Sequence, residues 1–314
     1  MQKIAVVGAG LMGHGIAQVF ALQGFSVGLT DVSAKALDAA VDNVRTNLAL
    51  LADQGIIEKR AAGPAVERIA TTTDMSRAVE GADFVVEAVI ENLEIKQNIF
   101  RELDAICPEK VIIATNTSVI SITEIAARAQ HKSRVVGTHF WNPPYLIPLV
   151  EVVRGDHTAD HVMDRTIDIL KSVGKHPVRV NKDVPGFVGN RLQHALWREA
   201  ISIVEHGIAD AATVDECVKF GFGLRLPILG PMENSDLVGT DLTLAIHDYL
   251  LKHLEHSPDA SALLKEIVAR GDLGFKSGRG FQQWSAEDIA ETHNRLKTYL
   301  LKVTSQPKSK GGND

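Results

Sequence analysis

Three closely spaced glycines near the start of the chain constrain its fold more than any other feature. Gly8, Gly10 and Gly13 follow an apolar run at 4–7, which is typical of a short buried strand, and precede a helical pattern of apolar residues at 11–24. The first glycine permits a sharp turn, the second leaves the backbone open to a phosphate, and the third lets the helix pack closely on the strand. This pattern predicts a strand–turn–helix unit whose helix N-terminus can receive an anion.

An acidic residue at the end of a second expected strand extends this signal. The segment 26–30 has the composition of a strand, and Asp31 follows it. It lies about 20 residues beyond the glycines, where a carboxylate binds the ribose hydroxyls of a dinucleotide. An acid here favours NAD, because it would repel the 2′-phosphate of NADP. We therefore expect NAD to contact Gly8, Gly10, Leu11, Met12, Gly13 and Asp31. The alternative interpretation is a tight turn with an aspartate that caps a helix.

Composition argues against several other classes of protein. The 314 residues favour two domains, and a hydrophobic content of 45% is sufficient for a sizeable core. A net charge of −6 gives no electrostatic reason to expect binding to nucleic acid or to a membrane surface. The two distant cysteines, Cys107 and Cys217, provide neither a disulfide framework nor a zinc site, so no metal is expected. Without a leader or a membrane-length apolar run, a cytoplasmic location is expected.

The pattern of the chain changes near residue 183. Strand and helix patterns alternate before it, which predicts a doubly wound, largely parallel α/β sheet of the Rossmann type. Only helical patterns follow, at about 188–206, 213–220, 241–254 and 260–270. We expect an NAD-binding domain at 1–183, a smaller all-helical domain at 184–304 and a flexible tail at 305–314. Apolar residues of the helical domain, such as Leu242 and Tyr249, fit either a homodimer interface or the domain's own core.

Polar residues follow or lie within three of the expected strands, near the sheet edge where such folds bind ligands. Asn116 and Ser118 come after one strand, His139 follows the next, and Glu151 lies in the strand after that. Oxidation of a secondary alcohol needs a base for the hydroxyl proton, and histidine suits this task because it titrates near neutral pH. A carboxylate on the other ring nitrogen would fix its tautomer. His139 and Glu151 fit this chemistry, although spacing alone leaves a structural histidine as the commoner interpretation.

The sequence resembles the L-3-hydroxyacyl-CoA dehydrogenase family over about residues 3–284. The shared motifs are, in order, GAGLMGHGIAQVFA, VVEAVIENLEIKQNIFREL, ATNTS, GTHFWNP with LVEVV, VGKHPVRVNKDVPGFVGNRL and LGFKSGRGF. The resemblance implies a Rossmann-type domain followed by a helical domain, with NAD-dependent oxidation of a hydroxyl group in the cleft between them.

The resemblance implies catalytic roles for four residues. His139 matches the family's catalytic base, and Glu151 matches the carboxylate that orients it. Ser118 and Asn190 match residues that bind the substrate oxygen. Without the resemblance, Asn190 could equally be a helix cap.

The resemblance also implies further contacts with the cofactor, by the residues Glu91, Lys96, Asn116, Asn142 and Lys276. Glu91 and Lys96 lie in the motif ENLEIK, and Lys276 lies in GFKSGRGF. Taken alone, Glu91 and Lys96 could be an ordinary surface charge pair, and Lys276 could be a solvated loop residue.

The helical insertion after Asp31 departs from the acyl-CoA pattern. In the acyl-CoA enzymes several lysines in this insertion suit the phosphates of coenzyme A. Here 46–55 contains no basic residue, and Lys59 and Arg60 come only later. Gly55 and the pair Gly63–Pro64 are expected to break the insertion into pieces. Because solvent-facing phosphates need few fixed contacts, the absence of lysines is also compatible with a coenzyme A substrate.

Two other segments resemble a branch of the family that acts on free hydroxy acids. The loop 140–148 is similar to that of L-gulonate 3-dehydrogenase and lambda-crystallin, of carnitine dehydrogenase and of a pyridine-carboxylate dehydrogenase. Arg225, within 223–231, could bind a substrate carboxylate through two hydrogen bonds, or it could be a surface arginine at a helix end. Trp141 could form a wall of the substrate pocket or pack beneath the loop.

The expected function is NAD-dependent oxidation of a secondary hydroxyl β to a carboxyl group, with a free hydroxy acid as the favoured substrate. The alternative is a short-chain L-3-hydroxyacyl-CoA dehydrogenase, such as a 3-hydroxybutyryl-CoA dehydrogenase of fatty acid metabolism. A third alternative is a non-catalytic NAD-binding structural protein. It is disfavoured because such a protein would not need the set His139, Glu151, Ser118 and Asn190.

Overall fold

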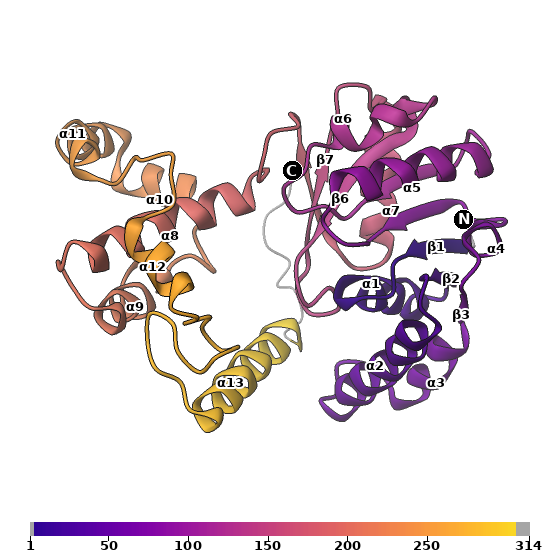
Figure 1. Ribbon diagram of the computed structural model, residues 1–314, viewed down its shortest axis with the longest axis horizontal. Coiled ribbons are helices and arrows are strands. Elements are labelled where there is room, and N and C mark those ends of the chain that lie inside the picture. Colours follow the sequence, from indigo (N-terminus) through magenta and orange to yellow (C-terminus); the bar gives the residue numbers. More distant parts are fainter. Residues whose placement is uncertain (1–2, 306–314) are drawn as a thin grey trace. The chain divides into compact units, whose positions relative to one another are not determined.

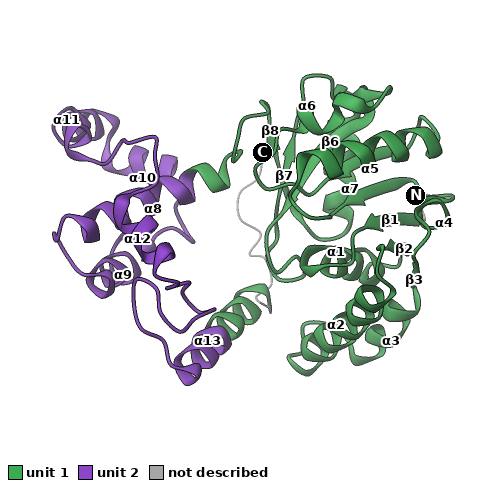
Figure 2. Cartoon of the chain, viewed as in Figure 1, with its two compact units in different colours: residues 1–191, 296–314 green, residues 192–295 purple. Residues whose placement is uncertain are grey.

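The structure is a computed structural model that describes residues 3–305. Within this range the chain divides into two compact units (Figure 2). Unit 1 contains residues up to Arg191 and from Leu296 onward, and unit 2 contains Leu192–Arg295. The domain boundary near residue 183 remains a prediction. The predicted flexible tail lies, apart from its first residue, outside the described residues.

Unit 1 is built on one sheet flanked by helices (Figure 1). The sheet has eight strands in the order β3–β2–β1–β4–β5–β6–β7–β8. The strands are β1 (Lys3–Val7), β2 (Ser26–Thr30), β3 (Ile69–Thr72), β4 (Phe84–Glu87), β5 (Ile112–Thr115), β6 (Val135–Phe140), β7 (Leu149–Val153) and β8 (His176–Val180). Neighbouring strands run parallel except β6 and β7, which are antiparallel. The segment 141–148 that joins them is too short for the crossover of about a dozen residues that parallel neighbours require.

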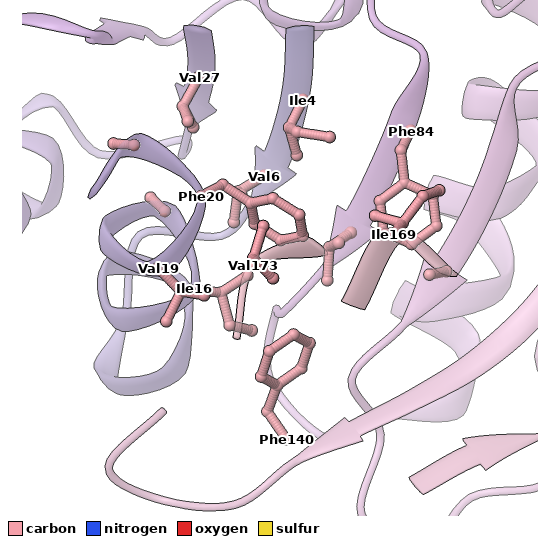
Figure 3. Close-up of a cluster of buried hydrophobic side chains, with 14 of the residues drawn as sticks. Ile4, Val6, Ile16, Val19, Phe20, Val27, Phe84, Phe140, Ile169 and Val173 are labelled. Carbon is pink, nitrogen blue, oxygen red and sulfur yellow. The ribbon is translucent and has the colours of Figure 1, made fainter. Parts of the chain in front are cut away.

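Helices cover both faces of this sheet. They are α1 (Leu11–Leu22), α2 (Ala34–Asp53), α3 (Lys59–Glu67), α4 (Met75–Val79), α5 (Leu93–Ile106), α6 (Ile122–Ile125) and α7 (Asp160–Ser172). Because side chains alternate along a strand, Ile4 and Val6 of β1 belong to one buried cluster, with residues of α1 and α7 (Figure 3). Residues of α2 belong to the same cluster. Ala5 and Val7 belong to a second cluster, with α5 and α6. The predicted Rossmann-type sheet is therefore confirmed.

The insertion after β2 differs from its prediction in one respect. Ser33 caps α2, because its hydroxyl accepts a hydrogen bond from the N–H of Ala36, and α2 ends shortly before Gly55. The expected break at Gly63–Pro64 is wrong, since α3 continues through Pro64. Ala65 is fully buried in the first cluster, and this packing offsets the single hydrogen bond that the proline cannot donate.

Unit 2 is helical. Its elements are most of α8 (Gly189–Glu205), α9 (Ala211–Phe220), α10 (Pro231–Val238), α11 (Thr240–Leu250), α12 (Ala262–Ala269) and the first half of α13 (Ala286–Ser305). Beyond β8 the described residues form no further strand, only isolated bridges near Arg279. The predicted helical region after the sheet is thus confirmed, although α10 and α13 were not anticipated. Up to residue 305, no helix of the structure has the length and apolar character needed to cross a membrane.

The C-terminal half of α13 returns to unit 1. Leu301 is buried there with Leu51 of α2 and Leu146, which lies in the segment between β6 and β7. The hydroxyl of Thr304 lies 3.3 Å from the carbonyl oxygen of Leu146. The segment that follows β6 therefore packs against α2 and the C-terminal half of α13.

Candidate active site

The glycine turn between β1 and α1 has the geometry expected of a dinucleotide cradle. Gly8 has a φ of 102°, and a Cβ atom there would lie 2.6 Å from the carbonyl oxygen of Ala88. A Cβ at Gly13 would lie 1.8 Å from the carbonyl oxygen of Gly8, whereas a Cβ at Gly10 would meet nothing within 4 Å. Two glycines therefore permit close backbone packing, and the third leaves space above the N-terminus of α1. This arrangement fits the pyrophosphate of NAD.

Asp31 follows β2 and connects it to this turn. Its Oδ2 accepts a hydrogen bond from the N–H of Ala9 at 2.8 Å, and its Oδ1 accepts one from the N–H of Ser33 at 3.0 Å. Asp31 is not the N-cap of α2, which is Ser33. Each carboxylate oxygen has a second lone pair that can accept a ribose hydroxyl.

Lys96 is buried in an ion-pair network and is not a surface residue. Its side chain is 1% exposed, and its ammonium lies 2.8 Å from Oε1 of Glu87 and 3.4 Å from Oε2 of Glu91. Glu87, at the end of β4, is fully buried and also accepts hydrogen bonds from the Thr115 hydroxyl and the Val89 N–H. Sequence reasoning missed Glu87. The signal was present, because a carboxylate inside the apolar run 84–89 must have buried partners.

Glu91 holds the turn that carries Ser118. One of its oxygens accepts hydrogen bonds from the Thr117 hydroxyl at 2.5 Å, the Ser118 N–H at 2.9 Å and the Val119 N–H at 3.1 Å. Burial raises the pKa of the Glu91 carboxyl, but the bond from Thr117 and the charge of Lys96 outweigh it and hold the pKa below its ordinary value. Glu91 is therefore an anion that fixes the backbone on both sides of Ser118.

His139 and Glu151 face each other across the antiparallel pair of strands. The register of β6 and β7 places them directly opposite, and His139 Nδ1 lies 2.7 Å from Glu151 Oε2. Both side chains are buried, at 6% and 1% exposure. The other oxygen, Oε1, accepts hydrogen bonds from the N–H groups of Val188 and Gly189.

The carboxyl of Glu151 is held ionised by these partners. Burial raises its pKa, but the hydrogen bonds from His139 and from the two backbone N–H groups outweigh burial and lower the pKa from its ordinary value of 4.5. An ionised carboxylate can only accept, so Nδ1 of neutral His139 is the donor and Nε2 is the acceptor. The pair therefore has the tautomer that a general base requires.

Two asparagines tie the surrounding segments together. Asn190, at the start of α8, donates from Nδ2 to the carbonyl oxygen of Ser118 at 3.0 Å. Asn116, after β5, accepts at Oδ1 a hydrogen bond from the N–H of Phe140 and is itself buried. The structure thus brings Ser118, His139 and Asn190 into one hydrogen-bonded region of unit 1.

The loop after His139 is held by a second residue that sequence reasoning missed. Lys175 is buried, and its ammonium donates to the carbonyl oxygens of Pro144 and, at 2.9 Å, of Ile147. Pro144 also packs on α1, since a Cβ at Gly15 would lie 2.9 Å from its ring. Asn142, in this loop, is exposed. The loop after His139 and α1 are therefore in direct contact.

Two of the predicted site residues lie in unit 2. Arg225 follows a short 3₁₀ helix (Phe222–Leu224) and is exposed, and Lys276 is exposed in the turn between Gly274 and Gly278. In the described part of the chain, no group of three or more His, Cys, Asp or Glu side chains is placed to hold a metal ion.

The sequence matches two family models. The 3-hydroxyacyl-CoA dehydrogenase NAD binding domain matches residues 3–184, and the 3-hydroxyacyl-CoA dehydrogenase C-terminal domain matches residues 186–284. Together they span nearly all of the described chain except α13.

Individual relatives differ in the substrates that they are named for. A 5-formyl-3-hydroxy-2-methylpyridine 4-carboxylate 5-dehydrogenase of Mesorhizobium japonicum is 36% identical over 91% of this chain and 92% of its own length. A probable 3-hydroxybutyryl-CoA dehydrogenase of Bacillus subtilis is 39% identical over 90% of this chain and 98% of its own length.

Solved structures show the same two kinds of relative. That of a 5-formyl-3-hydroxy-2-methylpyridine 4-carboxylic acid 5-dehydrogenase, described as an NAD+-dependent dismutase, has a TM-score of 0.89 at 34% identity and covers 96% of this chain and 97% of its own. That of (S)-3-hydroxybutyryl-CoA dehydrogenase from Ralstonia eutropha has a TM-score of 0.77 at 36% identity and covers 91% of this chain and 99% of its own.

Proposed function

The chain belongs to the 3-hydroxyacyl-CoA dehydrogenase family and is an NAD-dependent dehydrogenase acting on CH–OH groups, and on this premise we propose that it oxidises a free hydroxy acid. The hydroxyl to be oxidised is a secondary one, β to the carboxyl group. The match to the NAD binding domain confirms the predicted cofactor. A cytoplasmic location is part of the proposal, supported by the free Cys107 and Cys217.

His139 is the proposed base. Its Nε2 takes the proton of the substrate hydroxyl, while Nδ1 keeps its hydrogen bond to Glu151. The Glu151 carboxylate then stabilises the imidazolium that forms. When bound, NAD supplies the acceptor for the hydride that leaves the substrate carbon. Gly10, the N-terminus of α1 and Asp31 are the proposed binding groups for one end of this cofactor. Glu91, Asn142 and Lys276 are proposed for the other, and the buried Lys96 acts there through its ion pair with Glu91.

Ser118 and Asn190 are the proposed residues that hold the substrate oxygen. Both are polar, and the bond from Asn190 to the Ser118 carbonyl places them side by side in unit 1. Glu91 fixes the Ser118 backbone from the other direction. This double anchoring supports a binding role, because a hydroxyl that orients a substrate must itself be held in place.

The proposal of a free acid as substrate rests on the charge of the insertion after Asp31. Between residues 42 and 60 there are three basic and three acidic residues, so the segment is neutral. Each base lies next to an acid, in the pairs Arg45–Asp42, Lys59–Asp53 and Arg60–Glu58. The insertion therefore offers no surplus positive charge to the phosphates of coenzyme A.

The relatives support the same choice without excluding the runner-up. The Mesorhizobium relative is named for a substrate with a free carboxylate, and the solved structure with that activity has the higher TM-score of the two. The Bacillus relative is named for a coenzyme A thioester at a similar identity. A short-chain L-3-hydroxyacyl-CoA is therefore the second candidate substrate.

The test is NADH formation with matched substrates. Free L-3-hydroxybutyrate and L-3-hydroxybutyryl-CoA share one acyl group, and L-gulonate and carnitine extend the set of free acids. We expect kcat/KM to be highest for a free acid, and turnover of the coenzyme A ester alone would contradict the proposal.

Arg225 is the proposed anchor for the substrate carboxylate, and the same assay tests it. Arg225→Ala should raise KM for the preferred free acid about tenfold, the equivalent of one charge-assisted hydrogen bond. Arg225→Lys should recover part of the loss, because it keeps the charge without the planar fork. An unchanged KM in Arg225→Ala would remove this role.

A homodimer formed through unit 2 is the proposed assembly. Six large apolar side chains of this unit are between 69% and 80% exposed, namely Ile208, Phe220, Ile228, Met232, Leu237 and Tyr249. Apolar surface of this extent is typical of an interface, because a monomer gains nothing by exposing it to water.

A further inference from the structure

Trp141 donates a hydrogen bond to the carboxylate that orients His139. His139 is the second-last residue of β6 and Trp141, two positions later, follows the strand directly, so their side chains leave the chain in similar directions. The indole Nε1 lies 3.3 Å from Oε2 of Glu151, the same oxygen that accepts the bond from His139 Nδ1. The two rings are 5.3 Å apart at their centroids and tilted by 49°.

Glu151 has two donors on each of its oxygens. Oε1 accepts from the N–H groups of Val188 and Gly189, at 2.9 Å and 3.0 Å, and Oε2 accepts from His139 and Trp141. A carboxylate has about four lone-pair positions, so these four donors use its capacity. Trp141 is the fourth of them and, besides His139, the only side chain. The indole N–H therefore contributes to the orientation of Glu151 as well as to its packing.

The backbone at the start of α8 is arranged to admit the indole ring. A Cβ atom at Gly189 would lie 2.5 Å from Cζ2 of Trp141, so this position must be a glycine for the ring to approach. Phe187, two residues earlier, has a φ of 49° and packs its ring 5.7 Å from that of His139. A left-handed conformation in a residue other than glycine is costly and persists where surrounding contacts require it.

We propose that Trp141 is a positioning residue that acts on His139 through Glu151. This proposal rests on the proposed role of His139 as the base. The indole N–H holds Oε2 in place, and by sharing that oxygen it weakens the hydrogen bond from His139. A phenylalanine at position 141 would keep the ring beside Gly189 but would supply no donor, so it separates the hydrogen bond from the packing.

The test combines a spectroscopic signal with kinetics in the full chain. In protein labelled with 15N-histidine, the Nδ1–H proton of His139 is assigned as the low-field resonance that His139→Gln removes. We expect Trp141→Phe to move it to lower field, because Oε2 then accepts from His139 alone. We also expect kcat to fall about 3- to 10-fold, as for one net hydrogen bond, with KM nearly unchanged.

The matched control is Trp197→Phe. Trp197 lies on α8, is 48% exposed and packs its ring against His194, so the same substitution there should leave both the resonance and kcat unchanged. An unmoved resonance in Trp141→Phe would overturn the proposal. A raised KM with unchanged kcat would also overturn it, because Trp141 would then contact substrate.

The role of His139 as the base and the role of Trp141 in positioning it can be disproved separately. If His139→Gln kept its activity while Trp141→Phe moved the resonance, the hydrogen bonds would stand and the proposed base would be wrong. If His139→Gln lost its activity while Trp141→Phe moved nothing, the base would stand and the positioning role would be wrong.

Discussion

In unit 1, apolar side chains on both faces of the sheet are removed from solvent, and the candidate catalytic pair is buried beside them. In unit 2, Ile267 is the one apolar side chain buried to the same degree among residues 192–295. Folding is driven largely by burial of apolar surface, so a helical unit with so small a core needs further burial elsewhere. The proposed homodimer interface would provide it.

The difference separates the four candidate catalytic residues from the proposed dimer interface. His139, Glu151, Ser118 and Asn190 all belong to unit 1, where the sheet and its hydrogen bonds hold them. The exposed apolar residues belong mainly to unit 2. A substitution in the catalytic pair should therefore change turnover and leave the oligomeric state intact, and a substitution on the apolar surface should do the reverse.

The largest effect is expected for His139→Gln. Loss of a general base costs about 10²- to 10⁴-fold in rate, and we expect kcat to fall by this factor at saturating NAD. Glutamine can still donate a hydrogen bond to Glu151, so the thermal unfolding midpoint and the oligomeric mass should change little. Steady-state kinetics and light scattering on the same preparation measure the two quantities.

The control for this variant is His161→Gln. His161 is exposed on α7, and its imidazole has no part in the candidate site. We expect wild-type kcat there. Full activity in His139→Gln would show that another group takes the proton.

The next largest effect is expected for a charge placed on the apolar surface of unit 2. Ile228 is 80% exposed, and in the proposed dimer Ile228→Lys would place an ammonium in an apolar interface. A central interface residue contributes about 2–4 kcal/mol, so the dimer should dissociate at roughly 30- to 1,000-fold higher concentration. Sedimentation equilibrium would show the mass falling toward the 34.0 kDa of one chain.

Ile106→Lys is the matched control in unit 1. Ile106 is 37% exposed at the last position of α5, where a positive charge suits the helix dipole. We expect this variant to remain dimeric. The proposed dimer interface on unit 2 would be wrong if the wild-type protein sedimented as a single chain, or if the Ile228→Lys variant stayed dimeric.

The sequence predicted the parts of the site that depend on local patterns. The glycine turn, Asp31 and the order of strands and helices follow from spacing and periodicity, and the structure has them as expected. The antiparallel pairing of β6 and β7, which sets His139 opposite Glu151, was not predicted. The short segment 141–148 held the signal, because so few residues cannot form a crossover.

The partners of buried charges were harder to predict. Glu87 is bound by Thr115 and Lys175 by Ile147, both far away in sequence, so no local pattern identifies these partners. Of the surface charge pair considered for Glu91 and Lys96, the lysine proved to be buried and paired with the buried Glu87 as well as with Glu91. Such contacts depend on which strands become neighbours, and this is decided by packing across the whole sheet.

The smallest of the expected effects concerns stability and pH. Glu151 in unit 1 and Asp210 in unit 2 both have a lowered pKa. For Glu151, burial raises the pKa, but the hydrogen bonds from His139 and from the backbone outweigh it. For Asp210, the cause is the hydrogen bond from the Thr213 N–H at the start of α9. A carboxyl with a lowered folded pKa stabilises the fold above its unfolded pKa, and this stabilisation is lost as the pH falls through the folded pKa.

Glu151→Gln should therefore destabilise unit 1 at neutral pH by about 1–3 kcal/mol, the effect of losing charged hydrogen bonds in a buried place. The difference in unfolding free energy between wild type and variant should be largest at a pH above 4.5, the ordinary pKa of this carboxyl. It should narrow as the pH is lowered further. Hydrogen exchange of the β6 and β7 amides measures this free-energy difference within unit 1. Asp210→Asn is the control, because asparagine caps a helix as well as aspartate and the site is exposed to solvent. If the free-energy difference between wild type and Glu151→Gln stayed constant through acid pH, ionisation of Glu151 would not stabilise the strand pair.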